Sequence, residues 1–549
     1  MPPTQTISGN IVNVLGRRVR PGSLIVQAGR IVDIRWDDAN YSTFLIPGFV
    51  DAHIHVESSL LPPREFARLA VVHGTVATVS DPHEIANVLG TAGVEYMLDD
   101  ARAAPLKVHF GAPSCVPATP FDRAGATLAA ADVAALLDRG EIKYLSEMMN
   151  YPGVVAEDAE VFAKLAAARA RNKPIDGHAP RLRGAPLAKY VAAGISTDHE
   201  CFTLPEALEK LSLGMKILIR EGSAARNFDE LVSLLADYPD RCMLCSDDKH
   251  PHQLIEGHID QLVRRALSQG IDVLDALQAA CVNPVLHYGL DVGLLRPGDA
   301  ADFLEVNDLK RLEVQRVFIN GELVAADGRA LWPRSRSTVV NQFHALEKVP
   351  SDFAIPVSAD AAGREARVIE ALDGQLVTGC LRMRPTIVDG HVQADPQRDL
   401  LKITLVDRYE NRPPVTTLVK NFGLKQGAIA SSVSHDSHNI VAVGANDEAL
   451  CRAVNLVIAS RGGLAAVAGT TEQVLPLPIA GLMSDQDGPT VARQYAALEK
   501  LAQAWGSTLE APFMTLSFMA LTVIPSLKLG PTGLFDVDRF TPVDLFGEN

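Results

Sequence analysis

The feature that most restricts the fold of this chain is a series of eight short apolar runs, each followed by a helical stretch. The runs are rich in β-branched residues, whereas intervening segments such as 158–171 and 204–213 carry apolar residues at three-and-four spacing. Alternating strands and helices indicate parallel pairing through right-handed crossovers. Eight such units over about 230 residues predict an α/β protein with a (β/α)8 TIM-like barrel, whose active site forms at the C-terminal strand ends. The predicted strands are Phe44–Asp51, Thr75–Ser80, Lys107–Pro113, Ile142–Ser146, Pro174–Gly177, Gly194–Asp198, Lys216–Arg220 and Cys242–Ser246.

Histidines and carboxylates follow several of these strands and are predicted to face one rim of the barrel. Residues two apart in a strand point to the same face, so His53 and His55 can converge on one cation. One structural metal needs about four ligands, so six candidates indicate two divalent ions, with Glu147 able to bridge them. The competing interpretation is that the histidines are core residues satisfied by the backbone, and that the H-x-H pair is a chance feature. The six predicted ligands are His53, His55, Glu147, His178, His199 and Asp247.

Six blocks of sequence resemble the adenine deaminase family of the amidohydrolase superfamily. The glutamate in Ser-Glu-Met-Met-Asn is telling, because many binuclear relatives use a carboxylated lysine there. The resemblance implies a binuclear iron or manganese site that hydrolyses adenine to hypoxanthine and ammonia, a purine salvage reaction; the donor set accepts zinc as well. The blocks are Pro-Gly-Phe-Val-Asp-Ala-His-Ile-His-Val-Glu-Ser-Ser (47–59), Asp-Pro-His-Glu-Ile-Ala-Asn-Val-Leu-Gly (81–90), Pro-Ser-Cys-Val-Pro-Ala (113–118), Ser-Glu-Met-Met-Asn-Tyr-Pro-Gly-Val (146–154), Cys-Ser-Asp-Asp-Lys-His-Pro (245–251) and Ser-Val-Ser-His-Asp-Ser-His-Asn-Ile (432–440).

The chemistry of such a site needs two proton-transfer groups besides the metals. Two cations that share one water lower its pKa, and Asp247 is placed to accept a proton from that water and pass it to the leaving amine. A second group must protonate the ring nitrogen beside the attacked carbon. A desolvated carboxyl has a raised pKa, so the candidate acids are Glu84, Glu200 and Asp248, and the sequence does not choose among them.

Five residues are predicted to contact the substrate, and four of them have a plainer alternative. His83 and Glu84 can line the pocket or begin the helix after the second strand. Arg220, with its neighbours at 221 and 223, contacts a purine or only its own neighbours. His435 and His438 either complete the pocket or brace their own loop. Asp51 is assigned a supporting role behind the H-x-H pair. The predicted substrate-binding residues are His83, Arg220, Asp248, His435 and His438.

Strand patterns on both sides of the barrel predict a composite β-sandwich, as amidohydrolases have, and Asn320-Gly321 is typical of a tight hairpin. Residues 326–352 read as a linker, and an additional α+β domain follows. The predicted domains are 1–45, the N-terminal part of the sandwich; 46–290, the barrel; 291–335, the C-terminal part of the sandwich; and 353–549, the α+β domain.

Composition agrees with a cytoplasmic enzyme, and the family resemblance implies a small purine base as its partner. The net charge is −15 (51 minus 66) with no basic cluster, so nucleic acid is not an expected partner. No leader or apolar run of roughly 18 residues appears, so no membrane association is expected. Seven scattered cysteines favour a reducing compartment, and the Cys242/Cys245 pair is interpreted as buried and apolar. We expect a homo-oligomer, a dimer.

Three functions fit the sequence. The first is deamination of adenine or of an N6-substituted adenine, the second is hydrolysis of a cyclic amide at the same binuclear site, and the third is a catalytically idle metal-binding protein. Glu147 in place of a lysine and the C-terminal block favour the deaminase. The complete ligand set argues against an idle protein.

Overall fold

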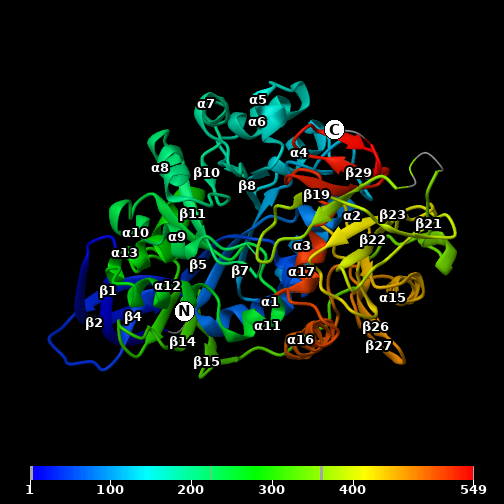
Figure 1. Ribbon diagram of the computed structural model, residues 1–549. Helices are drawn as coiled ribbons and strands as arrows, with labels where there is room; N and C mark the ends of the chain where they lie inside the picture. The colour runs from blue at the N-terminus through cyan, green and yellow to red at the C-terminus, as the bar shows by residue number, and fades with distance from the viewer. Residues whose placement is uncertain (1–3, 224, 359–360, 362, 548–549) are drawn as a thin grey trace.

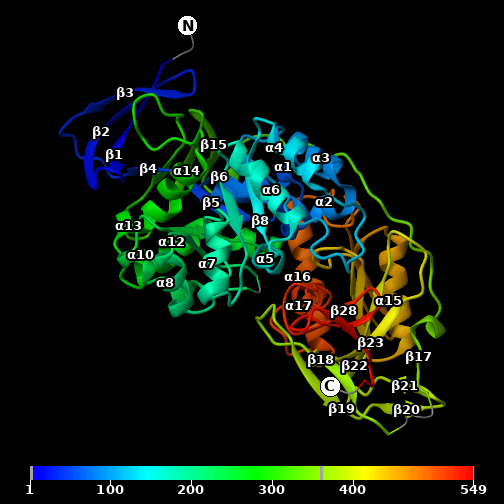
Figure 2. The same cartoon turned by 90° about the horizontal axis from the view of Figure 1, so that it is seen from above.

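The computed structural model describes residues 4–547 except 224, 359–360 and 362. Three parts follow one another in space (Figures 1 and 2): a sheet built from both flanks of the barrel, the barrel itself, and a C-terminal α+β module. In both views the barrel lies between the other two parts. The barrel thus has a neighbouring part on each side.

Eight parallel strands close into the predicted barrel. Five of them form one hydrogen-bonded sheet and three form a second, and a parallel bridge between Ile54 and Asp247 joins the first strand to the end of the last. Across the other seam, the Ser196 amide donates to the Ile175 carbonyl at 3.0 Å. The barrel strands are β5 (Phe49–Ile54), β6 (Thr75–Ser80), β7 (Lys107–Ala112), β8 (Ile142–Met148), β9 (Ile175–Gly177), β10 (Thr197–Asp198), β11 (Lys216–Arg220) and β12 (Cys242–Cys245).

The first predicted strand, Phe44–Asp51, is wrong as a single element. The chain instead forms β4 (Phe44–Pro47), which pairs in the flanking sheet, and β5, which begins at Phe49 in the barrel. Gly48 permits the change of sheet, since a Cβ at this position would lie 2.3 Å from the Val76 side chain. His53 consequently lies inside a strand rather than after one.

Helices follow the strands and cover the outside of the barrel. Asp158 begins one of them, since its side chain accepts a hydrogen bond from the Val161 amide at 3.0 Å. The segment 228–238 forms two short helices in place of one long one. The helices of this part are α1 (Pro63–Ala70), α2 (His83–Leu89), α3 (Thr91–Ala101), α4 (Ala130–Leu137), α5 (Tyr151–Val155), α6 (Ala159–Ala170), α7 (Gly184–Ala192), α8 (Leu204–Ser212), α9 (Phe228–Leu231), α10 (Leu234–Asp237), α11 (Pro251–Glu256), α12 (Ile259–Ser268), α13 (Val273–Leu277) and α14 (Asn283–Tyr288).

Strands from both flanks of the barrel combine in one continuous eight-stranded sheet. Its centre is the antiparallel pairing of β4 with β13, which joins the two flanks. Asn320 and Gly321 both have positive φ and form the predicted tight hairpin between β14 and β15. The remaining strands are β1 (Gln5–Asn13), β2 (Arg18–Gln27), β3 (Arg30–Trp36), β13 (Phe303–Val306), β14 (Val314–Ile319), β15 (Glu322–Ala326) and β16 (Arg329–Ala330).

The C-terminal module is built on a second eight-stranded sheet, in the order β19-β18-β23-β22-β25-β24-β26-β27. Two of its helices, α15 and α16, begin with side-chain caps; Asn446 accepts from the Ala449 amide at 2.8 Å. The elements are β17 (Ile355–Pro356), β18 (Ala366–Glu370), β19 (Gly379–Met383), β20 (Thr386–Val388), β21 (His391–Gln393), β22 (Leu400–Val406), β23 (Val415–Lys420), β24 (Ala428–Ser431), β25 (Ile440–Gly444), α15 (Asp447–Ala459), β26 (Gly463–Ala468), β27 (Thr471–Pro476), α16 (Gly488–Ala504), α17 (Pro512–Ser517), β28 (Leu527–Gly530), β29 (Gly533–Asp536) and β30 (Thr541–Val543).

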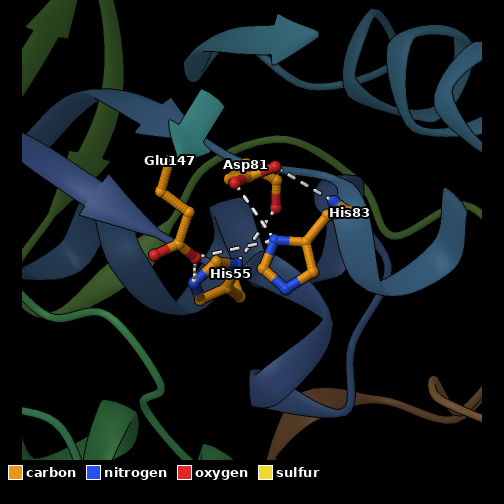
Figure 3. Close-up of side chains that lie close together, drawn as sticks. All are labelled: His55, Asp81, His83 and Glu147. Carbon is orange, nitrogen blue, oxygen red and sulfur yellow. Dashed lines mark hydrogen bonds and ion pairs between the residues drawn. The ribbon is translucent and has the colours of Figure 1, made fainter. Parts of the chain in front are cut away.

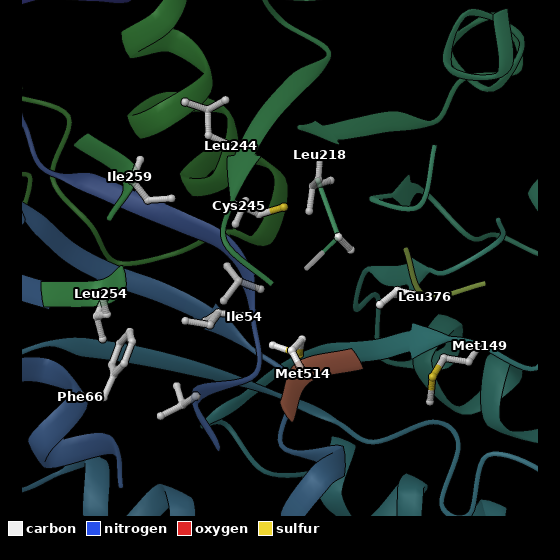
Figure 4. Packing of buried hydrophobic residues seen from close by; sticks show 14 of the residues in the cluster. Ile54, Phe66, Met149, Leu218, Leu244, Cys245, Leu254, Ile259, Leu376 and Met514 are labelled. Carbon is white, nitrogen blue, oxygen red and sulfur yellow. The ribbon is translucent and has the colours of Figure 1, made fainter. Parts of the chain in front are cut away.

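The module shares a hydrophobic core with the barrel. Leu376 and Met514 belong to the module, yet they are buried in the same cluster as barrel residues such as Ile54 and Met149 (Figure 4). Burying a side chain of this size stabilises a fold by roughly 1.5–3 kcal/mol. The module is therefore packed into the barrel face that carries the predicted site.

No helix in the described part of the chain combines the length and the apolar character that crossing a bilayer requires. The cysteine prediction is also consistent with the model, because Cys242 and Cys245 are buried and unpaired.

Candidate active site

The Glu147 carboxylate lies at the centre of a buried group of donors at the C-terminal end of the barrel. One oxygen, Oε1, is 3.2 Å from Nε2 of His55 and 4.0 Å from Nε2 of His53. The other, Oε2, is 2.8 Å from Nδ1 of His178 and 3.2 Å from Nε2 of His199. Each oxygen thus faces a different pair of histidines.

Asp247 completes the group on the side of the H-x-H pair. Its Oδ1 is 3.2 Å from Nε2 of His55 and 3.4 Å from Nε2 of His53. Its Oδ2 accepts a hydrogen bond from Nη1 of Arg220 at 2.7 Å. All six predicted ligands therefore come together, and we call them the donor cluster: His53, His55, Glu147, His178, His199 and Asp247.

The local backbone explains how two histidines and Asp247 meet. The Asp247 amide donates to the His53 carbonyl at 2.9 Å, so the end of β12 is fixed against β5. Asp247 has φ of 53°, an uncommon conformation for a residue with a side chain, and such conformations concentrate at functional sites. Beneath the pair, Asp51 accepts from the Ser246 amide at 3.0 Å and lies 2.8 Å from Nε2 of His258. Asp51 thus braces the two strands, the supporting role predicted for it.

The donor cluster fits divalent metal ions. Nδ1 of His55 lies 3.2 Å from the Asp81 carbonyl, and this contact leaves the Nε2 lone pair of His55 directed toward Glu147 and Asp247. His53 Nε2 and His178 Nε2 are buried and have no hydrogen-bond partner within the described residues. Buried ring nitrogens without partners are costly unless a ligand satisfies them. Imidazole and carboxylate are donors that zinc, iron and manganese all accept.

The charges of the two carboxylates also favour cations. Burial by itself would raise the pKa of Glu147, but His178 and His199 outweigh it and hold that pKa well below its usual range. Burial opposes ionisation of Asp247 in the same way, and Arg220 with His53 keeps its pKa well below the usual range. Two ionised carboxylates therefore face the histidine nitrogens.

Two residues of the second barrel strand's loop lie beside the cluster (Figure 3). Donor atoms of His55, Asp81, His83 and Glu147 all lie within 4.8 Å of one another. Asp81 Oδ2 is 3.0 Å from Nδ1 of His83 and orients that ring toward Glu147, at 3.6 Å. His83 is the first residue of α2 and also lines the pocket, so both interpretations of it hold.

Next to the cluster, Glu84 is enclosed by histidines from the C-terminal module. Nδ1 of His435 contacts Glu84 Oε1, and Nε2 of His438 contacts Glu84 Oε2. His435 and His438 lie on the loop between β24 and β25, more than 350 residues away in sequence. The module therefore reaches the barrel site directly.

A small pocket adjoins the cluster. Its polar side includes the predicted residues Glu84, Glu200, Asp248 and His435. Its apolar side is made by Met149 of the barrel and by module residues. The apolar module residues are Leu376, Phe518, Leu521 and Ile524.

Two predicted substrate contacts, Arg220 and His438, lie behind the pocket and not in its wall. Arg220 is fully buried and is held by Glu200 and Asp247, so it orients those carboxylates. His438 is likewise fully buried, between Glu84 and the backbone of its own loop. The sequence could not distinguish a residue that contacts the substrate from a residue that only supports such a contact residue.

Several residues in or beside the pocket were not identified from the sequence. Asp81 and Asp436 both stand inside blocks that carry the family resemblance, so a signal for them existed. Phe518, Leu521 and Ile524 had no such signal, because an apolar residue in a pocket wall has the same pattern as one in a core. Only the packing of the module on the barrel identifies them.

Comparison with known proteins places the chain in its family. Residues 44–324 match the model of the amidohydrolase family, and residues 375–541 match the adenine deaminase C-terminal domain. The chain is 56% identical over 548 residues to an adenine deaminase of Salinibacter ruber, with 100% of each chain covered. It is 52% identical over 550 residues to that of Methanosarcina barkeri, with 99% of each covered, and 52% identical over 539 residues to that of Sulfurovum sp., with 98% and 99% covered.

The barrel and its donor cluster define a metal-dependent hydrolase of the amidohydrolase type. Similarity along the whole chain, including the C-terminal domain, then narrows the assignment. The chain belongs to the adenine deaminase family of amidohydrolases.

Proposed function

We propose that this chain hydrolyses adenine to hypoxanthine and ammonia, as a purine salvage enzyme. The observation that carries the proposal is the identity of 56% over 548 residues to a protein named adenine deaminase, a match that covers both the barrel and the module. The buried donor cluster beside a small pocket supports a hydrolytic reaction on a compact substrate.

The donor cluster would hold two divalent cations, iron(II) or manganese(II) in preference to zinc. His53, His55 and Asp247 would bind one ion, His178 and His199 the other, and Glu147 would serve both. Glu147 supports this division because its two oxygens face different histidine pairs. When bound, such ions lower the pKa of a shared water enough to make it a nucleophile at neutral pH.

Asp247 would move protons during the reaction. Its Oδ1 faces the His53/His55 pair, at the side of the cluster where the attacking water would lie. The carboxylate would accept a proton from that water and deliver it to the leaving amine. Arg220 would hold the other oxygen, so that the carboxylate keeps its orientation during both transfers.

The ring nitrogen next to the attacked carbon also needs a proton donor. Glu84, Glu200 and Asp248 all line the pocket, as does His435. The remaining pocket wall is apolar and buried, and it would exclude water from the base while the reaction proceeds.

Adenine ranks ahead of its derivatives as the substrate. Deamination of an N6-substituted adenine ranks second, because the relatives that match the whole chain are named adenine deaminase. Hydrolysis of a cyclic amide ranks third. Homodimer formation and a cytoplasmic location remain predictions.

A substrate panel tests the proposal. The full chain, reconstituted with manganese or iron, is incubated with adenine, N6-methyladenine, guanine and a cyclic amide, and ammonia release is measured together with the base produced. We expect ammonia and hypoxanthine from adenine at a rate far above the others. Turnover of the cyclic amide alone would contradict the proposal.

A further inference from the structure

The loop between β24 and β25 places His435 and His438 against the Glu84 carboxylate. The two rings differ in the contacts of the nitrogen that does not face Glu84. Glu84 is 2% exposed and faces His435 with one oxygen and His438 with the other. Histidines that merely brace a loop would be expected to use both nitrogens within the protein. The second nitrogen of each ring therefore distinguishes a bracing role from a chemical one.

His438 uses both of its nitrogens. The Ser434 amide donates to Nδ1 of His438 at 3.3 Å, so Nδ1 is the unprotonated nitrogen. Nε2 then carries the proton and donates it to Glu84. His438 does not line the pocket, and a neutral ring satisfies all its contacts.

His435 uses only one nitrogen. Nδ1 contacts Glu84, and Nε2 has no hydrogen-bond partner in the part of the chain that the structure describes. The ring lines the pocket and stacks on Phe518, with centroids 4.3 Å apart and planes at 6°. Phe518 thus packs against a face of the His435 ring, and Glu84 holds the ring at its edge.

The charges around His435 are predominantly negative. Glu84 of α2, Asp248 of the loop after β12 and Asp436 of its own loop favour a protonated ring, whereas His438 and His250 oppose it. Burial lowers the pKa of His435, but Glu84 and Asp248 raise it to about 9. At neutral pH the ring carries a proton on both nitrogens.

We propose that His435, oriented by Glu84, is the acid that protonates the ring nitrogen of the bound purine. This step rests on the proposed function. As the water oxygen bonds to the amidine carbon, the electron pair of the ring C=N bond moves onto nitrogen and takes the proton of His435 Nε2. The leaving amine takes its proton from Asp247, which received it from the water. The remaining proton of the added hydroxyl is released as the carbonyl forms, and it replaces the one that His435 gave.

Two barrel carboxyls are less suited to this step, because hydrogen-bond donors hold three of their four oxygens. Both oxygens of Glu200 accept from the Arg220 guanidinium, Oε2 at 3.2 Å. Oδ1 of Asp248 accepts from the Ser58 hydroxyl. Glu200 is therefore held by Arg220 at both oxygens and Asp248 by Ser58 at one, whereas His435 Nε2 has no partner among the described residues.

The test uses the full metal-loaded chain with His435→Ala, His435→Gln and the matched control His438→Ala. Removing a general acid costs about 10²–10⁴-fold in kcat. We expect that loss in both His435 variants at unchanged metal content, and added imidazole should restore part of the rate in His435→Ala. His438→Ala touches the same carboxylate but should show no response to imidazole. The alkaline fall in the kcat/KM profile should persist in His438→Ala and vanish in His435→Ala.

The assay is run with whichever base of the substrate panel the unaltered chain deaminates, so that a wrong substrate and a wrong acid give different results. An inactive unaltered chain contradicts the proposed function. An active unaltered chain together with a His435→Gln variant within tenfold of it overturns the role of His435. Equal responses of His435→Ala and His438→Ala to imidazole would overturn it too.

Discussion

At the scale of single residues, Glu147 decides whether the site holds one metal or two. Its two oxygens face separate histidine pairs, at 3.2 Å from His55 and 2.8 Å from His178. A monodentate carboxylate on one ion would leave the other oxygen free for a hydrogen-bond donor, and no such donor contacts it among the described residues apart from the histidines. Sharing of Glu147 between two ions would account for this arrangement, as proposed above.

Glu147→Ala should therefore lower the metal content at both positions and abolish turnover. The fold should persist, because barrel packing does not depend on this side chain. Metal analysis of the purified variant, with circular dichroism as the control for folding, measures both effects. Two ions still bound per chain would contradict the shared role.

Asp247→Asn separates proton transfer from binding. Asparagine keeps an oxygen that can face the histidines, but it cannot accept a proton at neutral pH. We expect much of the metal to remain and kcat to fall by about 10²–10⁴-fold, the usual contribution of general acid–base catalysis. A variant within tenfold of the unaltered chain would transfer the role to Asp248.

At the scale of elements, the segment 518–524 forms the apolar wall of the pocket without being a helix or a strand. Contacts on both sides hold it in place. Thr522 donates to Asp122 of the loop between β7 and α4, at 2.9 Å to Oδ2. Lys528 of β28 donates to the Phe518 carbonyl at 2.9 Å and to the Leu376 carbonyl at 2.8 Å. The wall therefore depends on the barrel as well as on the module.

Thr522→Val should loosen this wall, because it removes the hydroxyl at nearly constant volume. Losing a buried hydrogen bond costs about 1–3 kcal/mol of stability. We expect KM for adenine to rise several-fold while kcat changes much less, since no proton-transfer group is touched. Steady-state kinetics measure the two constants, and a fall confined to kcat would argue against a positioning role for the segment.

Lys528 should make the stability of the protein depend on pH. Burial lowers its pKa to about 7, against roughly 10.4 in an unfolded chain. Between these two pKa values the unfolded chain binds more protons than the folded one. The free energy of unfolding therefore rises with pH across this window, by at most about 1.4 kcal/mol per pH unit. Lys528→Met should lack this contribution. Denaturation of both proteins from pH 7 to 10 measures it, and parallel curves would contradict it.

At the scale of the whole molecule, the module is part of the active-site half of the barrel. It contributes His435, Asp436 and four apolar residues to the pocket wall, and Leu376 also packs in the barrel core. A purine has several polar edges. A site rejects a wrong base when that base leaves buried polar groups of the site without a partner. The donor cluster occupies most of the barrel rim, so the module supplies some of these polar groups.

A chain ending at Gly328 should consequently be unstable. The cut exposes the barrel residues that now contact Leu376, Met514 and Phe518, at a cost of roughly 1.5–3 kcal/mol for each large side chain left unburied. We expect low soluble yield and binding of a hydrophobic dye. A soluble truncated barrel that unfolds cooperatively and deaminates adenine would show that the module is dispensable.

The sequence alone determined the barrel, the donor cluster and the family. Strand and helix periodicity are local properties, and the ends of parallel strands must meet at one rim, so His53, Glu147 and Asp247 could be grouped without coordinates. Their side-chain chemistry then limited the ligand to a divalent metal. The break between β4 and β5 was missed, because a continuous apolar run does not reveal a change of sheet.

Only the tertiary structure decided which residues complete the pocket. Contacts between Glu84 and the histidines at 435 and 438 join positions more than 350 apart in sequence, and no local pattern encodes such a distance. Packing also decides that Arg220 is buried behind the pocket and that Phe518 faces into it. The local sequence pattern of either residue would be the same in both places. Local physical chemistry therefore determined the donor cluster, and the docking of two distant parts of the chain determined the walls of the pocket.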